Sequence, residues 1–214
     1  MSEVSASNEG DDDRRPAEVV PFAPGRISRK PNRAKEAALS ADRARDLLDL
    51  DPETGIVRWR VNRGPAKAGS IAGTVRTDGY MTIGIDGRRY LLHRVVYLLH
   101  HGHWPAGILD HVNGDPRDNR PINIRLATVS QNGANKRRAT SKSGFRGVYQ
   151  RWRKWLAQIS VDGRLRSIGM FSTSEDAARA YDRAAVEAFG QFATTNAALG
   201  LLPAVVSPPL SSAA

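Results

Sequence analysis

The sequence predicts an α+β chain of two folded modules, flanked by a disordered N-terminal arm and a disordered C-terminal tail. Its 214 residues are enough for one large domain or two small ones. A strand–loop–strand–helix pattern fills the middle of the chain. After the basic run NKRRATSKSG, three short strands and one Ala-rich helix follow. This second pattern predicts a three-stranded antiparallel sheet packed on one helix.

Composition sets the boundaries of these parts. Residues 1–38 are rich in Ser, Pro, Asp and Arg without sustained periodicity, so we expect a disordered arm there. The end of the chain contains PAVVSPPLSSAA, which predicts a disordered tail over 198–214. Between these ends we expect a first domain at 39–138, a linker at 139–142 and a second domain at 143–197.

The first domain begins with a helix, a strand and a hairpin. LSADRARDLLDLD has Ser40 in the N-cap position and predicts a short helix. GIVRWRV alternates between apolar and polar residues, which predicts a strand. A turn at Asp86-Gly87 joins Tyr80–Ile85 to Arg88–Leu92, so we expect these two segments to form a hairpin.

Two helices and a strand complete the first domain. HRVVYLLHHG predicts a helix that ends at Gly102. IRLAT predicts a short strand, and VSQNGANKRR begins a helix with Ser130 as its expected N-cap. The segment NGDPRDNRP, which precedes IRLAT, is rich in turn-forming residues. We expect Asn113 and Asn119 to serve as turn residues rather than as catalytic ones.

The second domain is predicted to contain three strands and one helix. Turns near Trp152-Arg153 and at Asp162-Gly163 separate the strands. Ser172 and Glu175, three positions apart, fit a capping box at the start of the helix. Small side chains at helical spacing would let that helix lie close to the sheet. This stripe consists of Ala177, Ala180, Tyr181, Ala184 and Ala188.

Charge and composition narrow the function. A net charge of +10 and a pI of about 10.5 favour a polyanionic partner, most often nucleic acid. The absence of cysteine excludes disulfides and Cys-ligated zinc. No run approaches the length of a transmembrane helix and no secretory signal peptide is evident. We therefore expect no membrane partner and a protein that works inside a cell.

The segment ILDHVNGDPRDNRPINIRLATVSQN, residues 108–132, carries side chains suited to phosphodiester hydrolysis. That reaction needs a deprotonated water and a hard divalent cation held by oxygen ligands. His111 offers an imidazole for the first task. Asp110 offers a carboxylate to the cation, and Asn132 offers an amide oxygen to the same cation. The Asn123 side chain can bridge the backbone of the loop between the two strands.

This spacing resembles that of the HNH nucleases, in particular the H-N-N subclass found among phage and intron homing endonucleases. The matching strings are DHVNGD, DNRPINIRLAT and SQN, and Asn123 follows His111 by 12 positions. The upstream DGYMTIGIDGRRYLLHRVVYLLHHGHWPAG also resembles the lead-in of this family. The resemblance implies that residues 39–138 form a nuclease domain with a ββα-metal fold. His93, at the start of the lead-in helix, is a candidate phosphate contact.

The same resemblance assigns the site residues. It implies that His111 is the general base and that one Mg²⁺ or Mn²⁺ is bound by Asp110 and Asn132. It implies that Asn123 is a structural residue, which orients the loop that carries the base. The third motif position is Asn rather than His, which matches the subclass but provides a weaker, neutral ligand.

Basic and aromatic residues alternate in the second domain, as in proteins that read DNA. A small sheet can lie in the major groove and present alternate side chains to base edges. In WLAQIS, we expect Trp155, Ala157 and Ile159 to pack on the helix, which leaves Gln158 free to bond a base. Between positions 136 and 183, 12 Lys and Arg stand against four Asp and Glu. DNA binding should therefore weaken steeply as salt rises.

Residues 143–197 resemble the APETALA/ethylene-response-factor DNA-binding domain. The matching strings are SGFRGVYQR, KWLAQI, IGMFSTSEDAARAYDRAA and ATTN. The resemblance implies DNA-contacting positions at Arg146, Gly147, Arg151, Trp152, Lys154 and Tyr181, the last of which touches the backbone from the helix. From the charge pattern, Arg153 is also expected to reach a guanine or a phosphate. Tyr149, Ser160 and Ser167 depart from the plant pattern, so the base preference of plant members cannot be transferred.

These observations predict a metal-dependent endonuclease that its C-terminal sheet positions on double-stranded DNA. The resemblances imply a homing or mobile-element role, phage-borne, in the cytoplasm of a bacterium or an infected host. A DNA-binding regulator with an inactive nuclease remnant is the alternative. An RNA-binding protein is disfavoured, because the sheet lacks an exposed aromatic pair for base stacking. A single ββα-metal site handles one strand at a time, and a monomer is favoured. The target site and the number of strands cut stay open.

Overall fold

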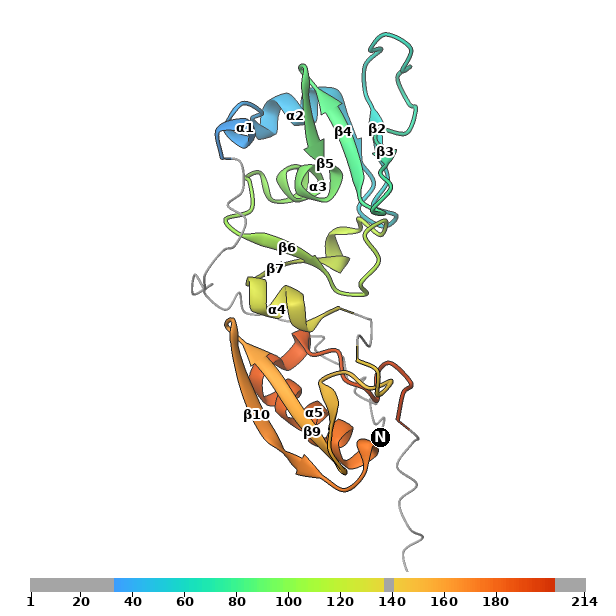
Figure 1. Cartoon of the computed structure of the whole chain (residues 1–214). Helices are drawn as coiled ribbons and strands as arrows, with labels where there is room; N and C mark the ends of the chain where they lie inside the picture. The colour runs from blue at the N-terminus through green and yellow to red at the C-terminus, as the bar shows by residue number, and fades with distance from the viewer. Residues whose placement is uncertain (1–32, 137–140, 203–214) are drawn as a thin grey trace, which may run out of the picture.

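The computed structural model describes residues 33–136 and 141–202, which form the predicted α+β arrangement (Figure 1). The N-terminal module comprises α1 (Arg33–Ala37), α2 (Ala41–Leu47), β1 (Leu48–Leu50), β2 (Val57–Trp59), β3 (Thr74–Val75), β4 (Met81–Ile85), β5 (Arg88–Leu91), α3 (Leu92–His101), β6 (Ile108–His111), η1 (Pro121–Asn123), β7 (Ile124–Ala127) and α4 (Val129–Ala134). The C-terminal module comprises β8 (Val148–Arg151), β9 (Lys154–Val161), β10 (Arg164–Phe171), α5 (Ser174–Phe189) and η2 (Gly190–Phe192). Most of the predicted arm and tail, and part of the predicted linker, lie outside the described residues. Among the helices of the described part, none is long and apolar enough to cross a membrane.

Three local predictions for the N-terminal module are confirmed. Ser40 caps α2 by accepting a hydrogen bond from the backbone N–H of Arg43 (3.1 Å). β4 and β5 pair as an antiparallel hairpin, and Asp86 and Gly87 at its turn have φ angles of 47° and 73°. Positive φ at both positions is what a two-residue type I′ turn requires. α3 ends at Gly102, which adopts the left-handed conformation.

Three predicted boundaries are wrong. The arm was expected to reach residue 38, but α1 forms because Glu36 pairs with Arg94 (2.7 Å) while both side chains are 11% exposed. The helix over LSADRARDLLDLD stops at Leu47, because Leu48–Leu50 pairs with β2 instead. The tail was expected from residue 198, but Leu202 is buried and packs in the core of the C-terminal module.

Two predicted helix caps are also wrong, each by one or two positions. α4 is capped by Thr128, not Ser130, since Thr128 and Gln131 form a reciprocal capping box. α5 is capped by Thr173, not Ser172, because Thr173 accepts a hydrogen bond from the backbone N–H of Asp176 (3.1 Å).

The C-terminal module is the predicted sheet on a helix. The strands are antiparallel in the order β10-β9-β8, and α5 packs on one face. Ala157 and Ile159 are buried on the helix side, as predicted. On α5, however, Ala188 is exposed, whereas Ala185 and Phe189 are buried. The buried stripe therefore continues from Tyr181 in steps of four residues.

α4 lies between the strand pair β6–β7 and the C-terminal module (Figure 1). One buried apolar cluster crosses this junction. It contains Ala127, Ala134, Ile159, Tyr181, Ala185, Phe189 and Phe192. The backbone N–H of Thr194 also donates to the carbonyl of Ala134 (3.2 Å). The two modules therefore share a core in addition to their covalent connection.

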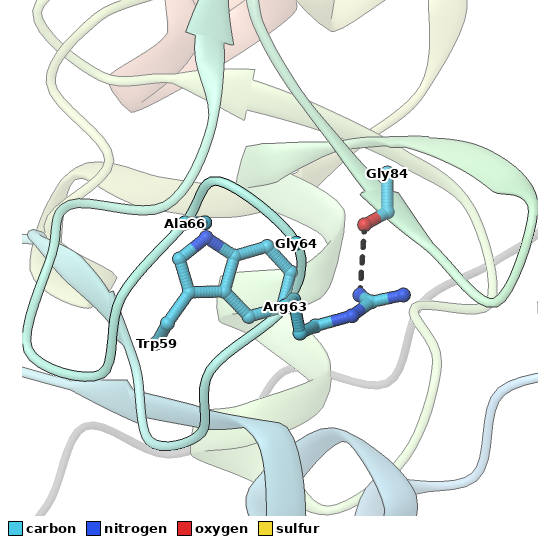
Figure 2. Close-up of a pocket in the computed structure, with 5 residues that line it drawn as sticks. All are labelled: Trp59, Arg63, Gly64, Ala66 and Gly84. Carbon is cyan, nitrogen blue, oxygen red and sulfur yellow. Dashed lines mark hydrogen bonds between the residues drawn. The ribbon is translucent and has the colours of Figure 1, made fainter.

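The loop between β2 and β3 is fastened by Arg63. Its guanidinium lies 4.8 Å from the centre of the Trp59 ring, and its Nη1 donates to the carbonyl of Gly84 (3.1 Å) (Figure 2). A shallow hollow of about 410 Å³ lies beside these residues. The Arg63 guanidinium is already bound by the Trp59 ring and the Gly84 carbonyl. We therefore interpret the hollow as part of the loop structure rather than as a binding site.

Candidate active site

The strand pair β6–β7 presents Asp110 and His111 at its end. The antiparallel register places Asp110 opposite Arg125, and His111 opposite Ile124. Asp110 is 4% exposed and His111 is 5% exposed. Neighbouring residues on a strand point to opposite faces, so the carboxylate and the imidazole are held by different partners.

Asn123 closes the loop that follows His111. Its Oδ1 accepts a hydrogen bond from the backbone N–H of Asn113 (3.0 Å). Its Nδ2 donates to Oδ1 of Asn113 (3.0 Å) and to the carbonyl of Asp118 (2.8 Å). Asn113 in turn accepts from the backbone N–H of Asp115 (2.9 Å), the pattern of a turn residue. The buried amide of Asn123 therefore joins both ends of the loop.

Gly55 supports the loop from outside. This residue lies in the turn between β1 and β2 with a φ of +71°, and a Cβ there would lie 2.4 Å from the backbone N of Arg120. Only glycine allows so close an approach, and glycine also tolerates the left-handed conformation. Asp118 and Arg120 form an ion pair on the solvent side (2.6 Å), and this arginine lowers the pKa of Asp118 to about 2.

Asn119 holds the imidazole of His111, a role that the sequence did not indicate. Asn119 is only 2% exposed, and its Oδ1 lies 3.3 Å from Nε2 of His111. Its Nδ2 is within hydrogen-bond distance of the Met81 sulfur (3.4 Å) and the Arg117 carbonyl (3.3 Å), which leaves Oδ1 as the acceptor. Nε2 of His111 therefore carries the proton, and Nδ1 keeps its lone pair.

Aromatic side chains form the wall beside His111. The ring of His93 lies edge-on to it with centroids 5.2 Å apart, and the ring of Tyr80 lies 6.1 Å away. Burial lowers the pKa of His111, while the Asn119 hydrogen bond and nearby carboxylates act in the opposite direction. Burial and the charge of His111 lower the pKa of His93 to about 3. His93 is 5% exposed and its Nδ1 has no partner among the described residues, so in this conformation it lines the site rather than the surface.

Two side chains hold the Asp110 carboxylate, and sequence reasoning missed both. Nε of Arg125 donates to Oδ2 (3.0 Å), and Nη2 lies 3.0 Å from the same oxygen as an ion-pair contact. Nδ2 of Asn135, just after α4, lies 3.1 and 3.0 Å from the two carboxylate oxygens and 2.6 Å from the His111 carbonyl. The cross-strand position of Arg125 was a usable signal, whereas the position of Asn135 depends on where α4 ends.

Asp110 and Asn132 offer oxygen donors of the kind that a hard divalent cation prefers. Oδ1 of Asp110 accepts one hydrogen bond, from Asn135, and a carboxylate oxygen can accept two. Asn132 is half-buried on α4, which packs beside β6, and its side-chain amide makes no hydrogen bond among the described residues. Within residues 33–136 and 141–202, no three or more His, Cys, Asp or Glu side chains form a cluster that could hold a metal ion.

The predicted DNA-binding residues fall into two groups. Arg151, Trp152 and Lys154 lie at the turn between β8 and β9 and are exposed, Trp152 by 92%. Arg153 in the same turn is exposed as well, and Gln158 on β9 is half-buried. The exposed side chains of this turn are accessible to a binding partner.

Arg146 and Gly147 are half-buried and Tyr181 is buried, and all three contact other parts of the protein. Nε of Arg146 donates to the Tyr181 hydroxyl (2.9 Å), and its Nη2 donates to the carbonyl of Gly133 in α4 (2.8 Å). Tyr181 is 6% exposed, and a Cβ at Gly147 would lie 2.0 Å from its ring. Arg146 and Tyr181 join the modules through Gly133 and Ala134 of α4, and Gly147 packs against Tyr181 within the C-terminal module. Contact of these three residues with DNA stays a prediction.

Both modules of the chain are similar to known proteins, and the N-terminal module is similar to HNH endonucleases. A family model for HNH endonucleases matches residues 90–134, which include Asp110, His111, Asn123 and Asn132. An uncharacterized HNH endonuclease of Acanthamoeba polyphaga mimivirus is 34% identical over 121 residues, which cover 56% of this chain and 63% of that protein.

The C-terminal half is similar to plant transcription factors. An ethylene-responsive transcription factor of Arabidopsis thaliana is 38% identical over 95 residues, which cover 42% of this chain and 58% of that protein. A dehydration-responsive element-binding protein of the same plant is 45% identical over 73 residues, 33% of this chain and 20% of that protein. No solved structure gives a significant match.

The chain spans about three-fifths of the length of the first curated relatives that it matches. One of its segments matches the family model for HNH endonucleases, and another is similar to the ethylene-responsive transcription factors.

Proposed function

We propose that this chain is a metal-dependent DNA endonuclease, positioned on double-stranded DNA by its C-terminal sheet. The observation that supports this most is the buried pair of Asp110 and His111 at the end of β6, with the imidazole held by Asn119. A solvated surface histidine would need no such partner. Burial keeps the imidazole neutral at neutral pH, and a neutral ring can accept a proton.

His111 acts as the general base in this proposal. With the proton on Nε2 fixed by Asn119, Nδ1 is the atom that takes a proton from the attacking water. The ring then carries a positive charge, which Asp110 and Asp118 stabilise electrostatically. Asn123 keeps the loop closed, so the base does not have to be repositioned in each turnover.

Asp110 and Asn132 are the proposed ligands of one Mg²⁺ or Mn²⁺. When bound, this cation would neutralise charge on the phosphate and stabilise the leaving 3′-oxygen. Arg125 and Asn135 orient the Asp110 carboxylate for that task. We further propose a mobile-element role of the homing type, phage-borne, in the cytoplasm of a bacterium or an infected host, and a monomer that cuts one strand at a time.

The exposed β8–β9 turn is the proposed DNA-reading surface. Arg151, Lys154 and Arg153 would contact phosphates or guanines, Trp152 would contact the sugar–base surface, and Gln158 would bond a base. Arg146, Gly147 and Tyr181 belong to the proposed interface only if the junction with α4 opens on DNA. His93 would reach a phosphate only after a similar opening.

One observation favours a second candidate, a DNA-binding regulator with an inactive nuclease site. Oδ2 of Asp110 is already paired with Arg125 (3.0 Å), a cation that occupies part of the carboxylate. If this pair does not yield to a metal, the module would bind DNA without cutting it.

Incubation of supercoiled plasmid with Mg²⁺ or Mn²⁺ separates the two candidates. Wild type should nick the plasmid at low salt, and His111→Ala should lose nicking while still retarding DNA in a gel. If neither protein nicks and both retard DNA, the regulator is the correct description. If wild type nicks, sequencing the ends of the cut DNA defines the target site.

A further inference from the structure

The C-terminal module contacts Arg125, the first of the two side chains that hold Asp110. Nη1 of Arg125 donates to the carbonyl of Gln191 (3.1 Å). The guanidinium also lies 3.7 Å from the centre of the Phe192 ring, within the range of a cation–π contact. Phe192 is 7% exposed. The position of the Arg125 guanidinium is therefore set from both modules, on one side by Asp110 and on the other by residues 191–192.

The same segment contacts Asn135, the second side chain that holds Asp110. The Thr194 hydroxyl donates to Oδ1 of Asn135 (3.2 Å), and both residues are 7% exposed. An amide side chain has one accepting and one donating end. With Oδ1 facing Thr194, Nδ2 must face Asp110 and the His111 carbonyl. A reversed amide would instead place its oxygen against a carboxylate, which is repulsive.

We propose that residues 190–194 are a positioning element of the nuclease site. Thr194 fixes the orientation of the Asn135 amide, Phe192 and Gln191 fix Arg125, and together these side chains hold the Asp110 carboxylate. The DNA-reading module therefore has a second role, because Asp110 is correctly placed only while that module is docked on α4. This inference rests on the proposed function, since it takes Asp110 to be the ligand of a divalent cation.

Thr194→Val in the full chain tests the inference, since valine keeps the shape of threonine and removes the hydroxyl. Mn²⁺ binding is measured without DNA by the electron paramagnetic resonance signal of the free ion, and nicking is measured against Mn²⁺ concentration. Loss of a direct partner of a metal ligand weakens metal binding by about 10- to 100-fold, and Thr194 acts one contact further out, through Asn135, so its loss should weaken binding by about 10-fold. We expect that loss in Thr194→Val and its recovery in Thr194→Ser, with unchanged DNA affinity in EDTA. If Thr194 served folding alone, Thr194→Val would not weaken Mn²⁺ binding while leaving DNA affinity unchanged.

Unchanged Mn²⁺ affinity in a folded Thr194→Val protein overturns the inference. If circular dichroism shows that this variant is unfolded, Phe192→Leu replaces it, because leucine keeps the apolar contact and removes the ring beneath Arg125. A wild type that neither binds Mn²⁺ nor nicks contradicts the proposed function instead. The side-chain amide resonance of Asn135 then decides: a shift in Thr194→Val that Thr194→Ser restores supports the inference, and an unmoved resonance overturns it.

Discussion

The loop beside His111 and the turn between β8 and β9 are both polar, yet they are built in opposite ways. In the loop, Asn119 and Asn123 are 2% and 5% exposed and their amides are satisfied within the protein. In the turn, Trp152 is 92% exposed, and Arg151 and Lys154 project into solvent. The loop holds the imidazole of His111 in one position, whereas the turn presents positive charge at the surface.

The difference follows from what each region must do. A proton acceptor works only in a narrow range of positions, so its neighbours must be held before the substrate arrives. Attraction between charged side chains and phosphates acts over about 8 Å at physiological ionic strength, so flexible side chains can provide it. Substitutions in the two regions should therefore change different quantities, which the following predictions test.

Gly147→Ala should cause the largest loss of stability, because Gly147, a predicted DNA contact, packs directly against the Tyr181 ring. The new Cβ would lie 2.0 Å from the Tyr181 ring, and the φ of +72° disfavours any side chain. We expect a loss of about 3 kcal/mol or more in the free energy of unfolding, from the clash and the left-handed backbone together. Urea unfolding measures it. Gly144→Ala is the control, since Gly144 has a φ of +78° but no atom near its Cβ position, and it should lose about 1–2 kcal/mol.

Asn119→Ala should lower the nicking rate by about 100-fold, part of the contribution of a general base. The imidazole of His111 would lose the acceptor that fixes its proton on Nε2. Asn119→Asp keeps an acceptor at that position and should retain more activity than the alanine variant. Single-turnover nicking at saturating protein measures both rates. Equal rates for all three proteins would show that Asn119 does not orient the base.

Arg151→Ala should weaken DNA binding by about tenfold and reduce the salt slope by about 1, with no effect on unfolding. The side chain is exposed at the β8–β9 turn and makes no contact that the fold needs. Arg183→Ala removes the same charge from an exposed position on α5 and is the matched control. Gel shifts at several salt concentrations give both quantities. If the two variants behave alike, the exposed turn does not read DNA.

His93→Phe should flatten the dependence of stability on pH, the smallest of the expected effects. The pKa of His93 is about 3 in the folded protein and about 6.5 in an unfolded chain, so the unfolded state binds more protons between these values. Stability therefore falls as pH is lowered below 6.5, by about 1 kcal/mol between pH 6.5 and 5.5 from this group. Urea unfolding at the two pH values measures it. His100→Phe, at an exposed position on the same helix, should keep the wild-type dependence.

Local patterns predicted the elements of the molecule better than the partners of its side chains. The Asp86-Gly87 turn, the Ser40 cap and the inward face of β9 depend on neighbouring residues only, and all three are confirmed. The positions of Asp110 and His111 on one strand end followed from the same kind of pattern.

Contacts between distant segments could not be predicted in this way. Asn135 lies 25 positions after Asp110 and reaches it only because α4 ends where it does. Arg146 was predicted to contact DNA from its sequence context, yet α4 supplies a carbonyl that competes for its guanidinium. Nothing in the local sequence around Arg146 specifies that α4 docks there.

The close approach of Gly55 to Arg120 has a consequence for the order in which the molecule folds. The chain segment between these residues must be closed into a loop before the turn after β1 can meet the segment beside His111. Contacts of such large sequence separation form slowly, because loop closure costs entropy before they contribute any stability. The active site should thus be among the last parts of the N-terminal module to mature. A peptide limited to the motif would lack this support and would not assemble the site by itself.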